Sequence, residues 1–75
     1  MKELVEFIAK ELVDFPEKVS VSEVEKEGQT VIELRVAEED MGKVIGKQGR
    51  IAKAIRTVVK AASMKENKKV QVEIL

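Results

Sequence analysis

Apolar residues recur with helical spacing near the start of the chain. Leu4, Ile8 and Leu12 lie four positions apart, so residues 2–13 are predicted to form an amphipathic helix. A proline at position 16 ends this helix, because it disfavours helical backbone geometry at the residue before it, Phe15. We expect Phe15 to fold back onto the core, since it is one of only two aromatic residues in the chain.

Two segments of alternating apolar and polar residues follow, and each is predicted to be a β-strand. The first covers residues 19–26, where the alternation slips by one position at Val24, so we expect an edge strand with a bulge. The second covers residues 30–36 and alternates more regularly than any other segment. A short turn at residues 27–29 makes the two strands an antiparallel hairpin.

The second half of the chain is predicted to contain two helices and a last strand. A short helix covers about residues 40–45, and a long amphipathic helix runs from residue 49 or 50 to about 64. After a polar turn, residues 70–74 alternate as a strand. Because a strand that returns after such a crossover is normally parallel to its neighbour, the sheet should be mixed. The predicted fold class is α+β, with three helices on one face of a three-stranded mixed sheet.

Composition limits the chemistry that is open to the chain. Its 75 residues are predicted to form one domain, close to the lower size limit for a self-supporting core. Cysteine and histidine are absent, so we expect no disulfide, no metal site and no cofactor. No apolar run approaches the length of a membrane span, and the acidic N-terminus is not a signal peptide. We therefore expect a cytoplasmic protein that does not bind membranes.

Positive charge is concentrated in one part of the chain. The formal net charge is zero, but residues 1–40 carry five basic and twelve acidic side chains, a balance of −7. Residues 41–60 carry six basic and no acidic side chains, a balance of +6. A single basic segment on an acidic body is a local footprint for an anionic partner. A solvated, lysine-rich helix face would have the same composition, and the neighbouring glycines favour the first interpretation.

Three of the four glycines, Gly42, Gly46 and Gly49, lie in this basic segment. A Gly-x-x-Gly turn lets an anionic group approach backbone N–H donors, and the helix that follows adds the positive end of its dipole. We therefore expect a phosphate group to bind at the turn. Gly42 lies inside the short helix, where glycine is about 1 kcal/mol less favourable than alanine. It indicates either a ligand that passes close to the backbone or tight packing of the helix on a strand.

The residues around the turn resemble the signature of KH domains, which has the form V-I-G-x-x-G-x-x-I. The matching segment runs from Val44 to Ile51, and residues 52–55 continue the likeness. The element order resembles the bacterial, type II form of this fold, and the whole chain resembles the small, stand-alone proteins of the KhpA family. This resemblance implies binding of about four nucleotides of single-stranded RNA at the glycine turn. It also implies an RNA-chaperone or post-transcriptional role, links to cell length and cell-wall synthesis, self-association, and pairing with a larger KH-containing protein.

Ten residues are expected to form the RNA-binding site. Backbone amides of the turn would receive the sugar–phosphate chain, with Lys47 at the tip as the main side-chain contact. Lys43, Arg50 and Lys53 would add positive charge. The expected site residues are Gly42, Lys43, Ile45, Gly46, Lys47, Gln48, Gly49, Arg50, Ile51 and Lys53.

The bases are expected to lie in an aliphatic groove, because no aromatic residue is near the turn to stack on them. Ile45 and Ile51 would line one side of this groove, with room left by Gly42, and apolar residues at the sheet edge would line the other. Core packing is an equally suitable role for the two isoleucines.

Two other functional classes share some of these features. A nucleotide-binding enzyme would need a Gly-x-x-x-x-Gly-Lys-Ser/Thr or dinucleotide-binding pattern, and both are missing. Without histidine or cysteine no catalytic set can be assembled, so we expect neither enzymatic activity nor a small-molecule substrate. A protein-interaction module is the stronger alternative. Ala54 and Ala61 border the basic face of the long helix, and Val31 and Leu75 point away from the main apolar face of their strands.

Overall fold

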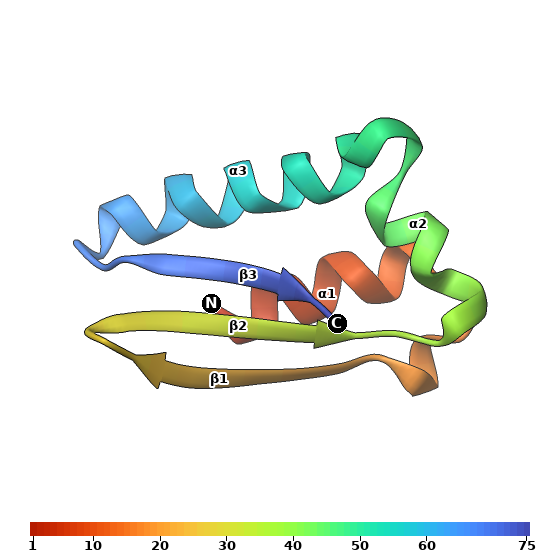
Figure 1. The fold of residues 1–75 in the computed structure, drawn as a ribbon, viewed down its shortest axis with the longest axis horizontal. Helices are drawn as coiled ribbons and strands as arrows, with labels where there is room; N and C mark the ends of the chain where they lie inside the picture. The colour runs from red at the N-terminus through yellow and green to blue at the C-terminus, as the bar shows by residue number, and fades with distance from the viewer.

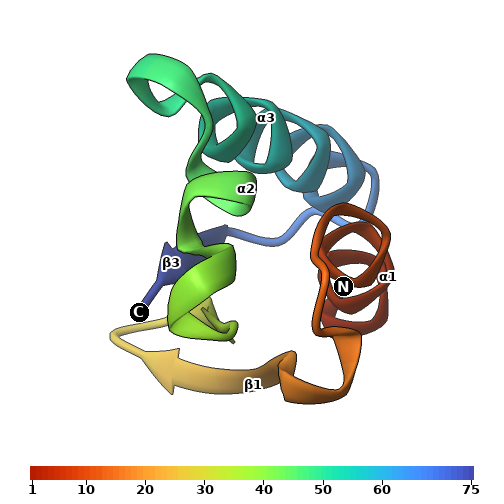
Figure 2. The same cartoon turned by 90° about the vertical axis from the view of Figure 1, so that its right-hand side faces the viewer.

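A computed structural model describes residues 1–75, and its elements follow the predicted order (Figure 1). The strands are β1 (Ser20–Lys26), β2 (Gln29–Arg35) and β3 (Val70–Ile74). The helices are α1 (Lys2–Leu12), α2 (Met41–Ile45) and α3 (Arg50–Lys65). Single 3₁₀ turns cover η1 (Pro16–Lys18), η2 (Glu38–Asp40) and η3 (Lys47–Gly49). The three helices lie on one face of the sheet (Figure 2), so the predicted α+β class is confirmed.

Strand β2 is the centre of the sheet, antiparallel to β1 and parallel to β3, as predicted. The pairing of β1 with β2 runs without interruption from Ser20 opposite Arg35 to Lys26 opposite Gln29, so the predicted bulge is wrong. Val24, which suggested the bulge, pairs with Val31 on the face that carries no helix. The spacing of apolar residues changes at this point because the side chains of Val21 and Val24 lie on opposite faces of the sheet.

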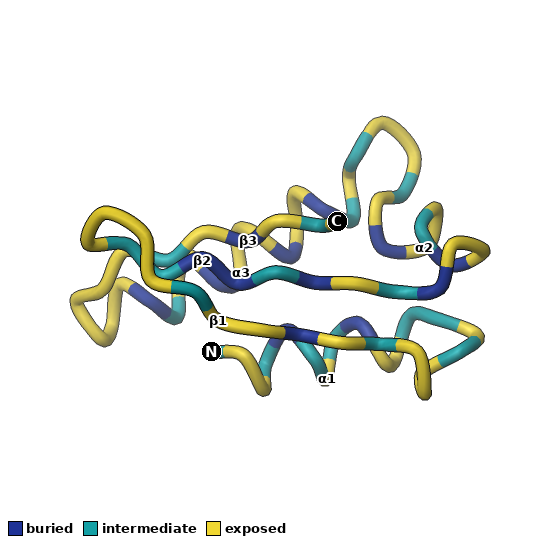
Figure 3. The backbone as a smooth tube through the Cα atoms, turned by 60° about the horizontal axis from the view of Figure 1, so that its bottom comes forward, coloured by how far each residue is buried: buried dark blue, intermediate teal, exposed yellow.

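The hydrophobic core fills the space between the helices and the sheet (Figure 3). Its buried members come from α1, all three strands and α3: Val5, Ala9, Val21, Ile32, Leu34, Ile55, Val59 and Val72. On α1 the buried side is centred on Val5 and Ala9, whereas the predicted stripe residues Ile8 and Leu12 are half-buried at its margin. This arrangement leaves one edge of α1 and α3 apolar and open to solvent.

The structure corrects two expectations about apolar side chains. Phe15 does not join the core cluster; it is half-buried, with Lys18 Nζ 5.4 Å from the centre of its ring. Val31 faces away from the helices as predicted, yet it is only 4% exposed, because Val24 and Gln71 flank it from the two neighbouring strands. Val31 is therefore not an exposed hydrophobic residue.

Candidate nucleic-acid interface

The Gly46–Gly49 turn joins α2 to α3 at one end of the molecule (Figure 1). Gly46 has φ 76° and ψ 175°, a combination that is essentially restricted to glycine. Left-handed helical geometry occurs at the next positions of the turn, Gln48 (φ 56°, ψ 26°) and Gly49 (φ 73°, ψ 17°). Three residues with positive φ within four positions turn the chain sharply, and the residues at the tip, Lys47 and Gln48, are exposed to solvent.

Two backbone amides at the tip of the turn have no internal partner. The Gly46 N–H donates to the Gly42 carbonyl at 2.8 Å, and the Gly49 N–H donates to the Gly46 carbonyl at 3.2 Å. The intervening amides, those of Lys47 and Gln48, donate to no backbone carbonyl, and both residues are exposed. Adjacent N–H groups without internal acceptors are available to an anionic ligand. Of the amides expected to receive phosphate, these two are the free ones.

Free positive side chains continue from the turn along α3. These side chains are exposed and make no ion pair within the chain: Lys47, Arg50, Lys53, Arg56 and Lys60. Helix α3 has 16 residues, which corresponds to a length of about 24 Å. The uncompensated positive charge therefore forms an extended track rather than a single point.

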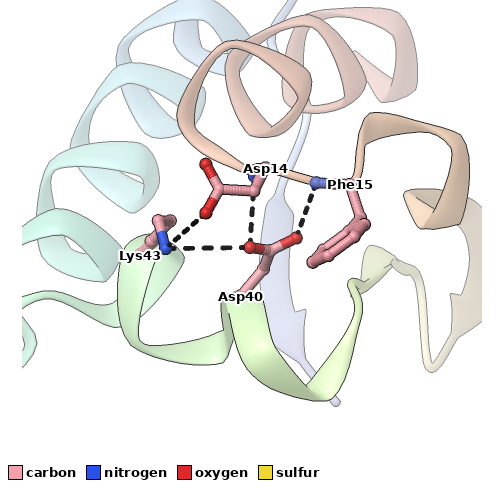
Figure 4. Close-up of polar contacts among 4 residues, drawn as sticks. All are labelled: Asp14, Phe15, Asp40 and Lys43. Carbon is pink, nitrogen blue, oxygen red and sulfur yellow. Dashed lines mark hydrogen bonds and ion pairs between the residues drawn. The ribbon is translucent and has the colours of Figure 1, made fainter.

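Lys43 differs from the other basic residues of this segment. Its Nζ lies 3.0 Å from Asp14 Oδ2 and 3.9 Å from Asp40 Oδ1 (Figure 4). The hydrogen bond that Lys43 donates to Asp14 and the negative charge of that carboxylate raise the pKa of Lys43 above its ordinary value, with a smaller effect from the charge of Asp40. Because two carboxylates already balance its charge, Lys43 adds little to the positive track.

A basic groove of about 430 Å³ lies between α3 and β3, next to the exposed edge of the sheet. Its apolar lining comes from Val59 and Met64 on α3 and from Val70 and Val72 on β3, and Met64 is the most exposed of these. Basic residues line it from both sides and no acidic residue does: Arg56, Lys60, Lys68 and Lys69. The Arg56 Nε–H donates to the Val72 carbonyl at 3.3 Å, so this side chain bridges α3 and β3.

These four basic groove residues are absent from the site expected from the sequence. Lys68 and Lys69 lie in the polar turn after α3, more than twenty residues from Gly46 in the chain, and only the parallel pairing of β3 brings them back beside α3. The signal available in the sequence was the basic character of residues 65–69, which a polar turn explains equally well. Val70 and Val72 of the edge strand β3 line this groove, and the use of the sheet edge as a wall for bases stays a prediction.

An apolar groove of about 300 Å³ lies on the other side of α3, against α1. It is lined by Ile8 and Leu12 from α1 and by residues of α3: Arg50, Ile51, Ala54, Ile55 and Val58. Ile51 therefore faces α1 and not the basic groove. Ile45 is 37% exposed and lines neither groove, so the two isoleucines do not form a common wall.

Gly42 lies on the exposed side of α2. A Cβ at this position would meet no atom of the chain within 4 Å, so packing on a strand does not explain the glycine. The open space thus argues against tight packing of the helix on a strand, and a ligand that passes close to the backbone of Gly42 stays a prediction.

The α-β-β-α-α-β order, with a Gly-x-x-Gly turn between its second and third helices, defines a type II KH domain. Comparison with known proteins agrees: the model of the KhpA/KhpB KH domain matches residues 2–74. RNA-binding protein KhpA of Clostridium perfringens is 73% identical over the full length of both chains, and its counterpart in Clostridium acetobutylicum is 69% identical, also over both full lengths. That of Caldanaerobacter subterraneus is 64% identical over the same span. No solved structure shows a significant match.

The chain belongs to the KhpA/KhpB family of KH domains, a family of RNA-binding proteins and not of enzymes. No group of three or more acidic side chains is placed so that it could hold a metal ion. None of the helices has the length and apolar character needed to cross a membrane.

Proposed function

We propose that this chain binds single-stranded RNA at the Gly46–Gly49 turn and along the basic groove between α3 and β3. One observation carries the proposal: two unpaired amides at the turn adjoin five unpaired cations, in a chain whose first forty residues have a net charge of −7. Phosphate contacts supply most of the affinity of such interfaces. A turn that offers both amides and cations matches the repeating anion of a nucleic acid better than it matches an acidic protein surface.

The proposed RNA path starts at the turn. The amides of Lys47 and Gln48 receive a phosphate, and the side chains of Lys47, Arg50 and Lys53 contact or attract its neighbours. The open space at Gly42 lets the sugar–phosphate chain pass α2, and the exposed side chain of Ile45 gives it an apolar contact. Ile51 supports the turn from below, and Gly46 and Gly49 give it its shape.

The basic groove then receives the bases. Half-buried Val70 and exposed Met64 offer an aliphatic surface, and Arg56 and Lys60 add charge beside it. Single-stranded RNA is recognised through unstacked bases, and no aromatic residue lines this groove to stack on them. About four nucleotides held on aliphatic side chains should give weak and poorly selective binding to one copy of the chain.

The double variant Lys47→Asp, Gln48→Asp tests the proposal, because it puts two negative charges where phosphate would bind. Both residues are exposed at a loop tip, so the free energy of unfolding should change little. A matched control is Lys2→Asp, Ser20→Asp, which changes the net charge equally at exposed positions remote from the turn in the sequence. RNA affinity should be abolished only in the first variant; full affinity there would refute the assignment of the turn.

The apolar groove between α1 and α3 favours a second role, self-association. Val58 is 45% exposed there, and the small side chain of Ala54 lets a second helix approach closely. Two copies on one RNA would raise the avidity of a weak single site. Light scattering of the wild type and of Val58→Asp, run beside RNA gel shifts, separates the roles. A monomeric variant that still binds RNA supports separate surfaces, whereas no RNA binding by any oligomer favours a protein-interaction module.

The cellular part of the proposal extends the resemblance to the family beyond RNA binding. We place the chain in the cytoplasm as a single KH domain acting as an RNA chaperone or post-transcriptional regulator, together with a larger KH-containing protein, in control of cell shape and cell-wall biogenesis. Crosslinking to cellular transcripts, followed by sequencing, tests this role directly. Recovery of no RNA above the level of Lys47→Asp, Gln48→Asp would count against it.

A further inference from the structure

Helix α2, which carries the turn, is too short to hold its own position. It has five residues, little more than one turn, and isolated helices of this length are unstable in water. Packing of Val44, which is fully buried, fixes one side of it. The N-terminal end of α2, where the chain enters the helix, needs a second contact. Any tilt of so short a helix would move the turn, because the turn begins directly after Ile45.

Asp40 lies at that end and is fully buried. Its Oδ1 accepts the backbone N–H of Asp14 at 3.1 Å, and its Oδ2 accepts the backbone N–H of Phe15 at 3.0 Å (Figure 4). The side chain makes no capping hydrogen bond to α2, although Asp40 occupies the N-cap position. Its two oxygen atoms instead tie α2 to the segment that leaves α1, across 25 and 26 positions of sequence.

Lys43 completes this arrangement from the next turn of α2. Its Nζ lies between the carboxylates of Asp14 and Asp40 and points toward both (Figure 4). A buried carboxylate is tolerated only when donors surround it, and two amides and one ammonium group do so here. Three polar contacts thus join α2 to the segment that follows α1, and a fourth, between Lys43 and Asp40, lies within the α2 end of the arrangement.

We infer that Asp40, bridged by Lys43 to Asp14, is a positioning residue that holds α2 and the Gly46–Gly49 turn in the geometry that binds RNA. This inference rests on the proposed function of the turn. It gives Lys43 a different role from Lys47, Arg50 and Lys53. Lys43 is part of the cluster of Asp14, Asp40 and Lys43, here called the clamp, and makes no phosphate contact. An interaction that fixes a ligand site without touching the ligand changes affinity but not the number of ions released on binding.

Two variants of the full chain test the inference. Asp40→Asn keeps the shape of the side chain but places an NH2 group opposite a backbone N–H, so one of the two amide bonds is lost. Lys43→Met removes the bridging charge at an exposed position and keeps the length of the side chain. Glu39→Gln is the control, since it removes a neighbouring negative charge that makes no hydrogen bond or ion pair. Affinity for a short, random-sequence single-stranded RNA is measured at several salt concentrations, and amide spectra are recorded on the free, folded proteins.

In Asp40→Asn the amide signals of Lys47 and Gln48 should shift in the free protein, and RNA affinity should fall roughly five-fold or more, with an unchanged salt slope. Lys43→Met should show a smaller fall with the same slope, and Glu39→Gln should match the wild type. Wild-type turn signals and wild-type affinity in folded Asp40→Asn would overturn the inference. A salt slope reduced by about 0.7 in Lys43→Met would do the same, because it would show a lost phosphate contact.

Two further outcomes remain decisive. If Asp40→Asn does not fold, the slope measured for Lys43→Met still decides whether that residue belongs to the clamp. If the wild type binds no RNA, the proposed function fails, while the turn signals of the free variants still show whether Asp40 positions the turn.

Discussion

Ile51 lies directly beneath Gly46. A Cβ on Gly46 would be 2.6 Å from Ile51 Cγ1 and 3.0 Å from both Cβ and Cδ1 of the same side chain. The first turn of α3 thus supports the backbone of the Gly46–Gly49 turn, and the support leaves room for glycine alone. The φ of 76° at Gly46 imposes the same restriction independently.

Gly46→Ala should therefore damage both folding and binding. The new methyl group displaces Ile51 and strains the backbone, which should lower the free energy of unfolding by about 1–3 kcal/mol. RNA affinity should fall further than the loss of folded protein explains. Urea unfolding and RNA titration at low temperature check this; an alanine variant with wild-type stability and affinity would contradict the described contact.

Gly42→Ala should have the opposite effect on stability. Its Cβ would meet nothing within 4 Å, and alanine favours a helix over glycine by about 1 kcal/mol, so the melting temperature should rise. RNA affinity should fall nevertheless, because the methyl group occupies the space proposed for the sugar–phosphate chain. Higher stability with unchanged affinity would remove Gly42 from the proposed path.

The hairpin turn offers a stabilising change remote from the RNA path. Glu27 and Gly28 form a two-residue turn and both have positive φ, at 51° and 79°. Such turns favour asparagine at the first position, where a glutamate is strained. Glu27→Asn should raise the free energy of unfolding by roughly 0.5 kcal/mol and leave RNA affinity unchanged. Thermal unfolding measures the first effect, and a loss of stability would contradict the turn geometry.

The salt dependence of binding should report the number of phosphate contacts. If about four phosphates are neutralised, the log–log slope of affinity against salt should be near −3. Raising salt from about 50 to 200 mM would then weaken binding roughly fifty-fold. A slope near zero would show that the free cations of α3 do not contact the RNA.

The regular parts of the fold were predictable because local patterns determine them. The alternation in residues 30–36 identified β2, helical spacing identified α1 and α3, and the glycines identified the turn. The false bulge at Val24 has a simple cause: period-two alternation on one face cannot show that the opposite face also carries an apolar pair.

The contacts that the sequence did not reveal join distant parts of the chain. Asp40 stands at the start of α2, yet the partners of its side chain are the amides of Asp14 and Phe15. Those two bonds also keep the backbone at Phe15 beside α2, and its side chain stays outside the core cluster. Lys68 and Lys69 join the basic groove only through the return of β3 to the sheet. No local pattern encodes such pairings.

Amide spectra recorded during titration with single-stranded oligoribonucleotides test the central claim most directly. The N–H signals of Lys47 and Gln48, which have no internal acceptor, should shift most strongly, followed by those of residues that line the basic groove. Signals of β1, the edge strand on the far side of the sheet from the groove, should stay in place. If RNA shifts other signals while those of Lys47 and Gln48 remain unmoved, the glycine turn is not where this chain holds RNA.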